Sequence, residues 1–91
     1  MNSKGWRCFL ELCLSAEDEK ILNELFDLLL TAEERSALET RCLLIKDLLE
    51  QKKTQREIAE DLNISIAKIT RGSNALKQIS PKLKQYLMDL L

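Results

Sequence analysis

The sequence predicts an all-α fold of six short helices, and two observations carry that prediction. The 91 residues include only two glycines and one proline, and no segment alternates between apolar and polar residues as a half-buried strand does. Residues suited to cap helix N-termini divide the chain: Ser15, Thr31, Thr54, Ser65 and Ser80. The length suits one small domain, so we expect a single domain over residues 1–91.

The first half of the chain predicts three helices. Residues 6–13 place apolar side chains on one face, and Ser15 is expected to cap a second helix that runs to about residue 29. Thr31 and Glu34 have the spacing of a capping box, which predicts the start of a long helix over residues 32–51. We expect this long helix to be the central scaffold.

The second half predicts three more helices. Thr54 and Glu57 repeat the capping box before a helix over residues 55–62. That helix should stop at Asn63, which tolerates the left-handed conformation of a tight turn. Ser65 then caps a helix over residues 66–77, and Ser80 with Pro81 opens the last, over residues 81–91.

The apolar content predicts a homodimer without membrane contact. Of the residues, 45% are apolar, and stretches such as "LFDLLL" and "CLLIKDLL" are apolar on more than one helical face. Such helices need cover on several sides, which a short chain supplies poorly. No apolar run approaches the roughly 20 residues of a membrane span. The N-terminus also lacks a signal-peptide pattern, so we expect a cytoplasmic protein.

The titratable residues argue against an enzyme and against a bound metal. Histidine is absent, which removes the commonest general base and metal ligand. No serine or cysteine has an evident activating partner. Cys8, Cys13 and Cys42 lack metal-ligand spacing and are expected to be buried small hydrophobes in a reducing compartment.

The charges are segregated along the chain. Residues 1–34 carry eight acids and three bases, whereas residues 35–91 carry seven acids and eleven bases. No acid occurs from Leu62 through Met88, a stretch that contains Lys68, Arg71, Lys77, Lys82 and Lys84. This basic stretch is either a solvated surface or a surface that faces phosphates, and charge alone does not decide.

Residues 55–77 have the layout of a helix-turn-helix, with an ordinary helical hairpin as the alternative. Ile58 and Leu62 fall on the buried side of the first helix, and Ala59 is small where the second helix crosses. Ile64 fills the corner after the turn, and Ile69 anchors the second helix from beneath. The N-terminal half of the second helix enters the major groove in this motif. Its outward positions are Ile66, Ala67, Thr70 and Arg71.

Gly72 interrupts the second helix of the motif, at a cost of roughly 0.5–1 kcal/mol relative to alanine. A generic motif has a bulky apolar brace near this point, and Ala75 one turn later is small as well. We therefore expect the helix to lie over a gap that a small flat ligand fills. Gly72→Leu should then preserve or raise stability while it weakens ligand binding.

At this point three segments can be compared with a known family. "LTAEERSALETR", "QREIAEDL" and "ITRGSNALK" closely resemble the tryptophan repressor family, and the resemblance extends from about Trp6 through Lys77. It implies an intertwined all-helical homodimer that binds L-tryptophan as corepressor, with no other cofactor. The liganded dimer would bind double-stranded operator DNA of genes for tryptophan synthesis or uptake.

The resemblance also implies the ligand residues: Leu28, Leu30, Thr31, Arg41, Arg71, Gly72 and Ala75. Arg41 and Arg71 would lie on opposite faces of the indole ring. Arg71 and the Thr31 hydroxyl would hold the ligand carboxylate. The backbone carbonyls of Leu28 and Leu30, which could belong to the partner chain, would accept from the ammonium group.

Gly72 would leave room for the ring. Ala75 stands where many family members have a serine whose hydroxyl helps to bind the ammonium group, so here the carbonyls would act alone.

For DNA, the resemblance implies that Arg56 contacts a base edge, and its guanidinium fork suits guanine. The residues implied to contact phosphates are Gln55, Lys68, Asn74 and Lys77. The residues implied to face bases, largely through water, are Ile66, Ala67 and Thr70.

Two alternatives stay open: a helix-turn-helix dimer that binds DNA without ligand, and a purely structural helical dimer. Arg41 with the Arg71–Gly72 pair argues against the first, and the basic stretch argues against the second.

Overall fold

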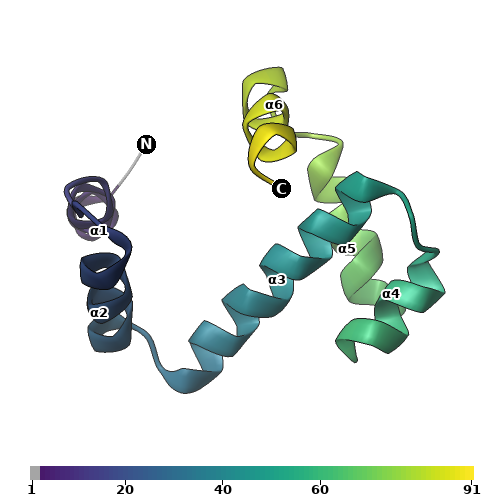
Figure 1. Cartoon of the computed structure of the whole chain (residues 1–91), viewed down its shortest axis with the longest axis horizontal. Coiled ribbons are helices and arrows are strands. Elements are labelled where there is room, and N and C mark those ends of the chain that lie inside the picture. Colours follow the sequence, from purple (N-terminus) through teal and green to yellow (C-terminus); the bar gives the residue numbers. More distant parts are fainter. Residues whose placement is uncertain (1–2) are drawn as a thin grey trace. The chain divides into compact units, whose positions relative to one another are not determined.

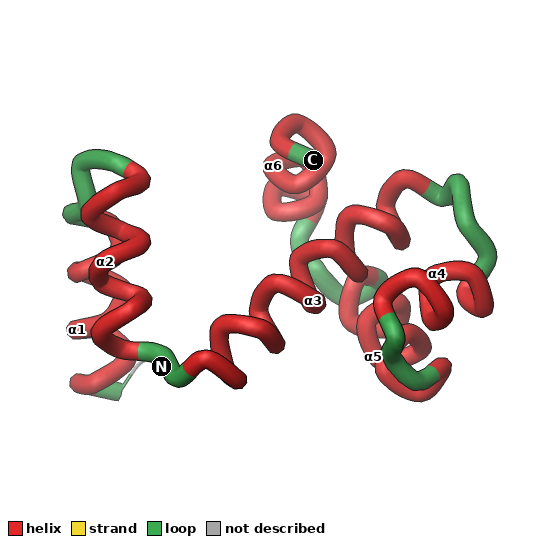
Figure 2. Tube along the Cα trace, turned by 60° about the horizontal axis from the view of Figure 1, so that its bottom comes forward, coloured by secondary structure: helices red, strands yellow, loops and turns green. Residues whose placement is uncertain are grey.

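In the computed structural model, which describes residues 3–91, these residues form six helices and no strand (Figure 1). The helices are α1 Lys4–Leu14, α2 Glu19–Leu29, α3 Ala32–Glu50, α4 Gln55–Leu62, α5 Ile66–Leu76 and α6 Pro81–Leu90. Short loops join them (Figure 2). The predicted all-α class and the number of helices are confirmed for the described residues. α3 stops at Glu50 because Gln51 has a left-handed φ of 56°, which no α-helix continues.

Reciprocal capping boxes open α3 and α4, as predicted. The Thr31 hydroxyl accepts from the Glu34 amide at 3.1 Å, and the Glu34 carboxylate accepts from the Thr31 amide at 2.9 Å. Thr54 and Glu57 make the same pair of bonds, at 3.1 and 3.0 Å. The predicted single-bond caps are also present: Ser65 on α5 and Ser80 on α6. Each cap satisfies amide groups that the first turn of a helix leaves without partners.

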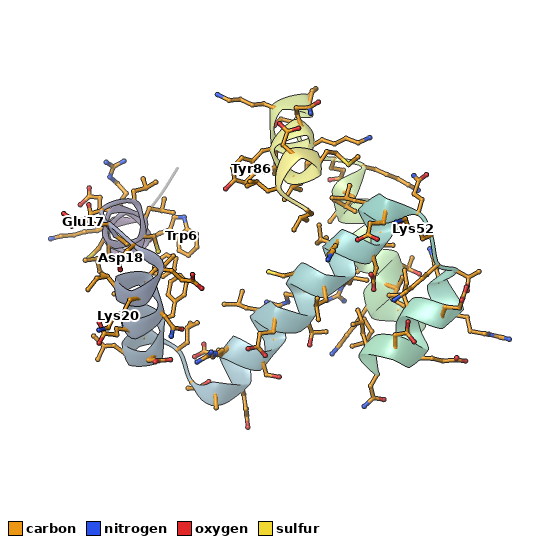
Figure 3. The ribbon with its side chains drawn as sticks, viewed as in Figure 1. Trp6, Glu17, Asp18, Lys20, Lys52 and Tyr86 are labelled. Atoms are coloured by element: carbon orange, nitrogen blue, oxygen red, sulfur yellow. The ribbon has the colours of Figure 1, made fainter. Side chains whose placement is uncertain are left out.

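The start of α2 differs from the prediction. Asp18, labelled in Figure 3, is the N-cap instead of Ser15, and its carboxylate accepts from the Ile21 amide at 2.9 Å. Ser15 instead ends α1, where its amide donates to the Glu11 carbonyl at 3.0 Å. A carboxylate at an N-terminus also gains from the helix dipole, which favours the aspartate over the serine.

The chain divides into two compact units, one that ends at Arg35 and one over Ser36–Leu91. In the first unit α1 and α2 meet through aromatic rings. Phe9 stacks on Phe26 with ring centroids 6.1 Å apart, and Trp6 is tilted against Phe9 at 5.3 Å. Neither helix has a buried residue. The single domain expected over residues 1–91 stays a prediction.

The second unit holds the described core, where α4 and α5 pack beside the C-terminal half of α3 (Figure 1). The buried residues of this core are Leu44, Ile58 and Ile69, and the partly buried residues packed against it are Leu48, Ala59, Leu62 and Ile64. The predicted inward positions of the helix-turn-helix are therefore confirmed. The two α3 leucines are the part of the core that the motif did not include.

α6 has no buried residue, and Tyr86 on it is exposed (Figure 3). Among the described residues, no helix has the length and apolar character needed to cross a membrane.

Candidate DNA-binding and ligand site

The turn between α4 and α5 gives the helix-turn-helix its shape. Asn63 has φ 54° and ψ 49°, the left-handed conformation that the sequence predicted. The Ile64 amide donates to the Ala59 carbonyl at 3.1 Å, and this bond closes the turn. Ile64 then packs on the core, and Ser65 starts α5 at once. The turn thereby fixes the direction in which the N-terminal half of α5 projects.

All eight predicted DNA-contacting side chains are exposed: Gln55, Arg56, Ile66, Ala67, Lys68, Thr70, Asn74 and Lys77. We call these eight residues the DNA-facing surface. α5 shows the two environments most clearly, because Ile69 is 0% exposed whereas Ile66 is 48% exposed. An exposed isoleucine on a helix otherwise anchored by its apolar residues is available for contact with a partner.

Polar contacts lie at both ends of α4: a lysine bridge that reaches Asp61 in its last turn, and the capping box at its first turn. The Lys53 ammonium lies 2.9 Å from the Asp61 carboxylate of α4 and 3.8 Å from the Asp47 carboxylate of α3. The hydrogen bond to Asp61 raises the pKa of Lys53 above its ordinary value. The backbone amide and then the hydroxyl of Thr54 lower the pKa of Glu57. The capping box was predicted, whereas the lysine bridge was not, because its carboxylates come from different helices.

Leucine side chains of α3 occupy the space next to Gly72. A Cβ atom added at Gly72 would lie 3.0 Å from Leu44 Cδ2 and 3.6 Å from Leu48 Cδ1. The expectation of an open gap is therefore wrong for this chain. Gly72 instead permits a close approach between the α5 backbone and the α3 leucines. The pattern of α5 alone could not reveal this, because the filling side chains lie far away in the sequence.

The predicted ligand residues fall into two groups, each in its own unit. Leu28, Leu30 and Thr31 lie at the end of α2 and the start of α3, and Leu28 is 80% exposed. The second group is on α3 and α5, where the exposed members are Arg41, Arg71 and Ala75 and the partly buried one is Gly72.

The first group offers the polar atoms that the resemblance assigns to it. The Leu28 carbonyl lies in the last turn of α2, where a helix leaves carbonyl groups without intrahelical partners. The Thr31 hydroxyl accepts from the Glu34 amide, so its proton stays available to donate to a carboxylate.

The cysteines differ from the prediction. Cys8 and Cys42 are exposed and Cys13 is half-buried, because the helix faces that carry them are not covered within this chain. Over residues 3–91, no group of three or more cysteine, aspartate or glutamate side chains is placed to hold a metal ion.

Comparison with known proteins identifies the family. The sequence model described as "Trp repressor protein" matches residues 4–91. A Trp operon repressor homolog from Chlamydia caviae is 47% identical over 89 residues, which cover 98% of this chain and 88% of the relative. A homolog from Chlamydia trachomatis serovar D is 51% identical over 83 residues, 91% of this chain and 88% of the relative. A Haemophilus influenzae homolog is 40% identical over 90 residues, 99% of this chain and 89% of the relative.

The chain belongs to the Trp repressor family. Trp repressors regulate transcription by binding DNA and do not catalyse reactions, so this chain is a tryptophan-responsive transcriptional repressor and no enzyme. The helix-turn-helix of a Trp repressor is here α4 and α5.

Proposed function

We propose that this protein is an L-tryptophan-activated repressor that binds, as a homodimer, operator DNA of genes for tryptophan synthesis or uptake. The observation that carries the proposal is the exposure of the whole DNA-facing surface on a helix-turn-helix with its own buried core. A repressor works where the DNA is, so the proposed location is the cytoplasm.

On DNA, α5 enters the major groove and its N-terminal half faces the bases. Arg56, at the start of α4, donates to a guanine edge through its guanidinium fork. The phosphate contacts come from four exposed side chains: Gln55, Lys68, Asn74 and Lys77. The acid-free stretch that begins at Leu62 supports this assignment, because no carboxylate there repels the phosphates.

L-Tryptophan binds with its indole ring between Arg41 and Arg71, and its carboxylate accepts from Arg71 and the Thr31 hydroxyl. The ammonium group donates to the carbonyls of Leu28 and Leu30, which in the symmetric dimer come from the partner chain. The exposure of both arginines supports the proposal, since each guanidinium can reach a ligand. Ala75 offers no hydroxyl, so the carbonyls alone bind the ammonium group.

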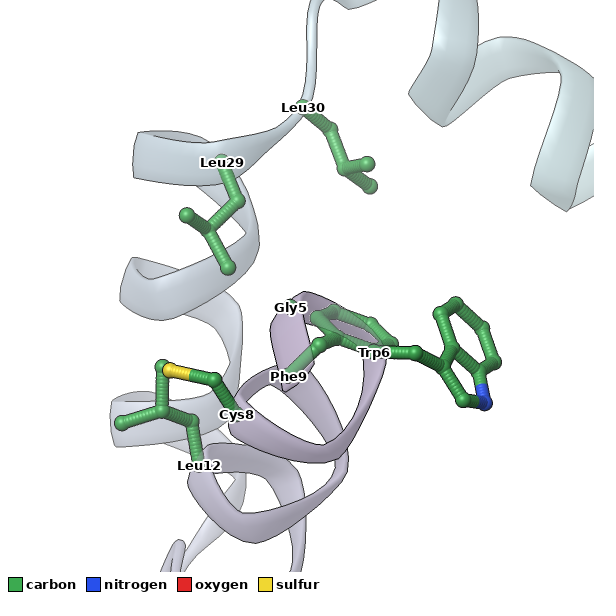
Figure 4. A pocket seen from close by; sticks show the side chains of 7 residues that line it. All are labelled: Gly5, Trp6, Cys8, Phe9, Leu12, Leu29 and Leu30. Carbon is green, nitrogen blue, oxygen red and sulfur yellow. The ribbon is translucent and has the colours of Figure 1, made fainter. Parts of the chain in front are cut away.

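A second chain covers the apolar surfaces that one chain leaves exposed. A shallow apolar pocket on the first unit is lined by Gly5, Trp6, Cys8, Phe9, Leu12, Leu29 and Leu30 (Figure 4). Leu83, Tyr86, Met88 and Leu90 on α6 are exposed as well. Exposed apolar side chains in such number are typical of a chain that folds with a partner.

The test begins with a duplex selected from a random-sequence pool by the purified protein in the presence of L-tryptophan. Calorimetry should detect binding of L-tryptophan, and the affinity for the selected duplex should rise when the ligand is added. Indole propionate, which lacks the ammonium group, should bind more weakly if the carbonyls act as proposed. Equal affinity for DNA with and without L-tryptophan would support the ligand-independent alternative.

Two variants separate the proposed DNA roles. Lys77→Ala should weaken binding about equally on the selected and a scrambled duplex, and should reduce the salt slope by about 0.9 for each subunit of the homodimer. Arg56→Ala should instead weaken the selected duplex more than the scrambled duplex, by about 1–3 kcal/mol for each lost bidentate base contact. The same uniform loss in both variants would contradict the role assigned to Arg56.

A further inference from the structure

α3 packs against α5 at a position where α5 has no side chain. A Cβ atom at Gly72 would lie 3.0 Å from Leu44 Cδ2 and 3.6 Å from Leu44 Cγ. Leu44 itself is 6% exposed and belongs to the same core as Ile69 of α5. The leucine side chain therefore fills, from α3, the place where a helix-turn-helix ordinarily carries an apolar residue on its second helix.

This contact decides how far α5 stands from α3. Protein interiors are close-packed, so a change of a single carbon at such a contact moves the neighbouring helix or leaves it loosely held. α5 carries six residues of the DNA-facing surface: Ile66, Ala67, Lys68, Thr70, Asn74 and, at its C-cap, Lys77. A displacement of α5 on Leu44 changes the position of all of them together.

We propose that Leu44 is the positioning residue for DNA recognition, because it fills the space at Gly72 and thereby sets the position of α5. The inference rests on the proposed function, since it concerns the same DNA-facing surface. In this proposal Leu44 acts through the α5 backbone, because its side chain is only 6% exposed and packs against α5 at Gly72. Sequence selectivity depends on the position of α5, whereas non-selective attraction to phosphates depends mainly on charge.

A pair of single-carbon changes tests the fit. Leu44→Val removes one carbon from α3, and Gly72→Ala adds one carbon on α5 at the same contact. Each variant alone changes the distance or the tightness of the contact, whereas the double variant conserves the total volume, which cores tolerate best. Ile58→Val is the matched control, because Ile58 is 1% exposed in the same core but lies on α4, and its atoms are not among the three nearest to a Cβ at Gly72.

The experiment measures the affinity of each protein, with L-tryptophan present, for the selected duplex and for a scrambled duplex of the same length. Leu44→Val and Gly72→Ala should each weaken the selected duplex about tenfold, or about 1.4 kcal/mol. Binding to the scrambled duplex should stay within about twofold, because the charges are unchanged. The double variant should recover most of the affinity, and Ile58→Val should leave the selectivity unchanged. Circular dichroism of each variant checks that the helices are intact.

Three outcomes would overturn the proposal. The first is a selectivity loss in Leu44→Val no larger than in Ile58→Val. The second is losses in the two single variants that multiply in the double variant, which would mean that the residues act independently. The third is a double variant in which Leu44→Val restores the thermal stability lost in Gly72→Ala but does not restore the affinity for DNA. That result would assign Gly72 to ligand binding alone.

The proposed ligand response is judged separately. It fails if the unchanged protein binds the selected duplex equally well without L-tryptophan, and the comparison of the variants on that duplex still decides the role of Leu44. An unchanged protein that selects no duplex contradicts both proposals.

Discussion

The helix-turn-helix and the α1–α2 pair are both amphipathic, yet only the helix-turn-helix belongs to a core of buried residues, together with α3. α4 and α5 enclose Ile58 and Ile69, which are at most 1% exposed. α1 and α2 enclose no residue to that degree, and Leu29 and Trp6 remain about half exposed in the apolar pocket (Figure 4). The apolar periodicity of the two regions is similar, but the helix-turn-helix also packs against apolar side chains of a third helix, α3.

This difference shows what periodicity means in a short chain. A stripe of apolar residues indicates that one face of a helix must be buried. It does not indicate whether the residues that bury it come from the same chain. The helix-turn-helix receives its cover from Leu44 and Leu48 of α3. α1 and α2 meet through aromatic contacts but have no buried residue, so we expect their remaining cover to come from a second copy of the chain.

The largest expected effect therefore lies in the α1–α2 pair. Leu29→Glu would put a charge into the apolar pocket and should raise the dissociation constant of the dimer about 1,000-fold, or about 4 kcal/mol. Unfolding of the unchanged protein should depend on its concentration, as for any obligate dimer. Sedimentation equilibrium measures the dissociation constant, and urea unfolding at several protein concentrations measures the concentration dependence. Asn23→Glu, on a polar position of α2, is the control and should leave the dimer intact. A folded monomer of the unchanged protein at micromolar concentration would contradict the idea that a second chain covers the α1–α2 pair.

The next effect tests the closed core. Ile69→Ala should cost about 3 kcal/mol, because it leaves a cavity where the side chain is fully buried. Ile66→Ala, one turn earlier on α5, should change stability by no more than about 0.5 kcal/mol, since surface substitutions seldom do more. It should instead weaken binding to the selected duplex. Urea unfolding at one protein concentration compares the two. Equal costs would mean that both faces of α5 are covered in the assembled protein.

The parts of this architecture that follow from local sequence were predictable. The capping boxes at Thr31 and Thr54 and the left-handed turn at Asn63 each depend on residues within four positions of one another. The inward positions Ile58 and Ile69 follow from helical spacing within one motif. α2 was placed too early because two capping residues, Ser15 and Asp18, compete within three positions.

Contacts between distant segments were not predictable in the same way. The place of Leu44 against Gly72 depends on how α3 packs on α5, and the Lys53 bridge depends on carboxylates from two helices. The outward positions Ile66, Ala67 and Thr70 followed from the spacing of the motif, whereas the other candidate DNA residues came from the resemblance. Apart from Gly72, the ligand residues came from the resemblance, since an exposed arginine such as Arg41 carries no signal of its own.

Gly72 shows how such a contact reverses a prediction. From the sequence, Gly72→Leu should preserve or raise stability. In the structure even a Cβ atom would lie 3.0 Å from Leu44 Cδ2, so a leucine overpacks the α3–α5 contact. We now expect a loss of about 1–3 kcal/mol, measured by urea unfolding. Gly5→Leu is the control, because a Cβ atom there meets nothing within 4 Å. Higher stability in Gly72→Leu would restore the idea of an open gap.

The smallest expected effect concerns the first turn of α4, at the edge of the closed core. The amide and hydroxyl of Thr54 lower the pKa of Glu57 from its ordinary value of 4.5, so folding favours the ionised carboxylate. A carboxyl group with a lowered folded pKa stabilises the protein above its unfolded pKa. That contribution is lost as the pH falls below 4.5 and through the folded pKa.

Glu57→Gln keeps a side-chain acceptor for the Thr54 amide but cannot titrate. The free energy of unfolding of this variant should therefore fall less steeply than that of the unchanged protein between pH 4.5 and 3. Urea unfolding at a fixed protein concentration across that range measures the two slopes. Glu60→Gln removes a charge from the same helix without touching the cap and serves as the control. Parallel curves for Glu57→Gln and the unchanged protein would show that the capping carboxylate gains nothing from its charge, and that the neutral hydrogen bond alone holds the start of α4.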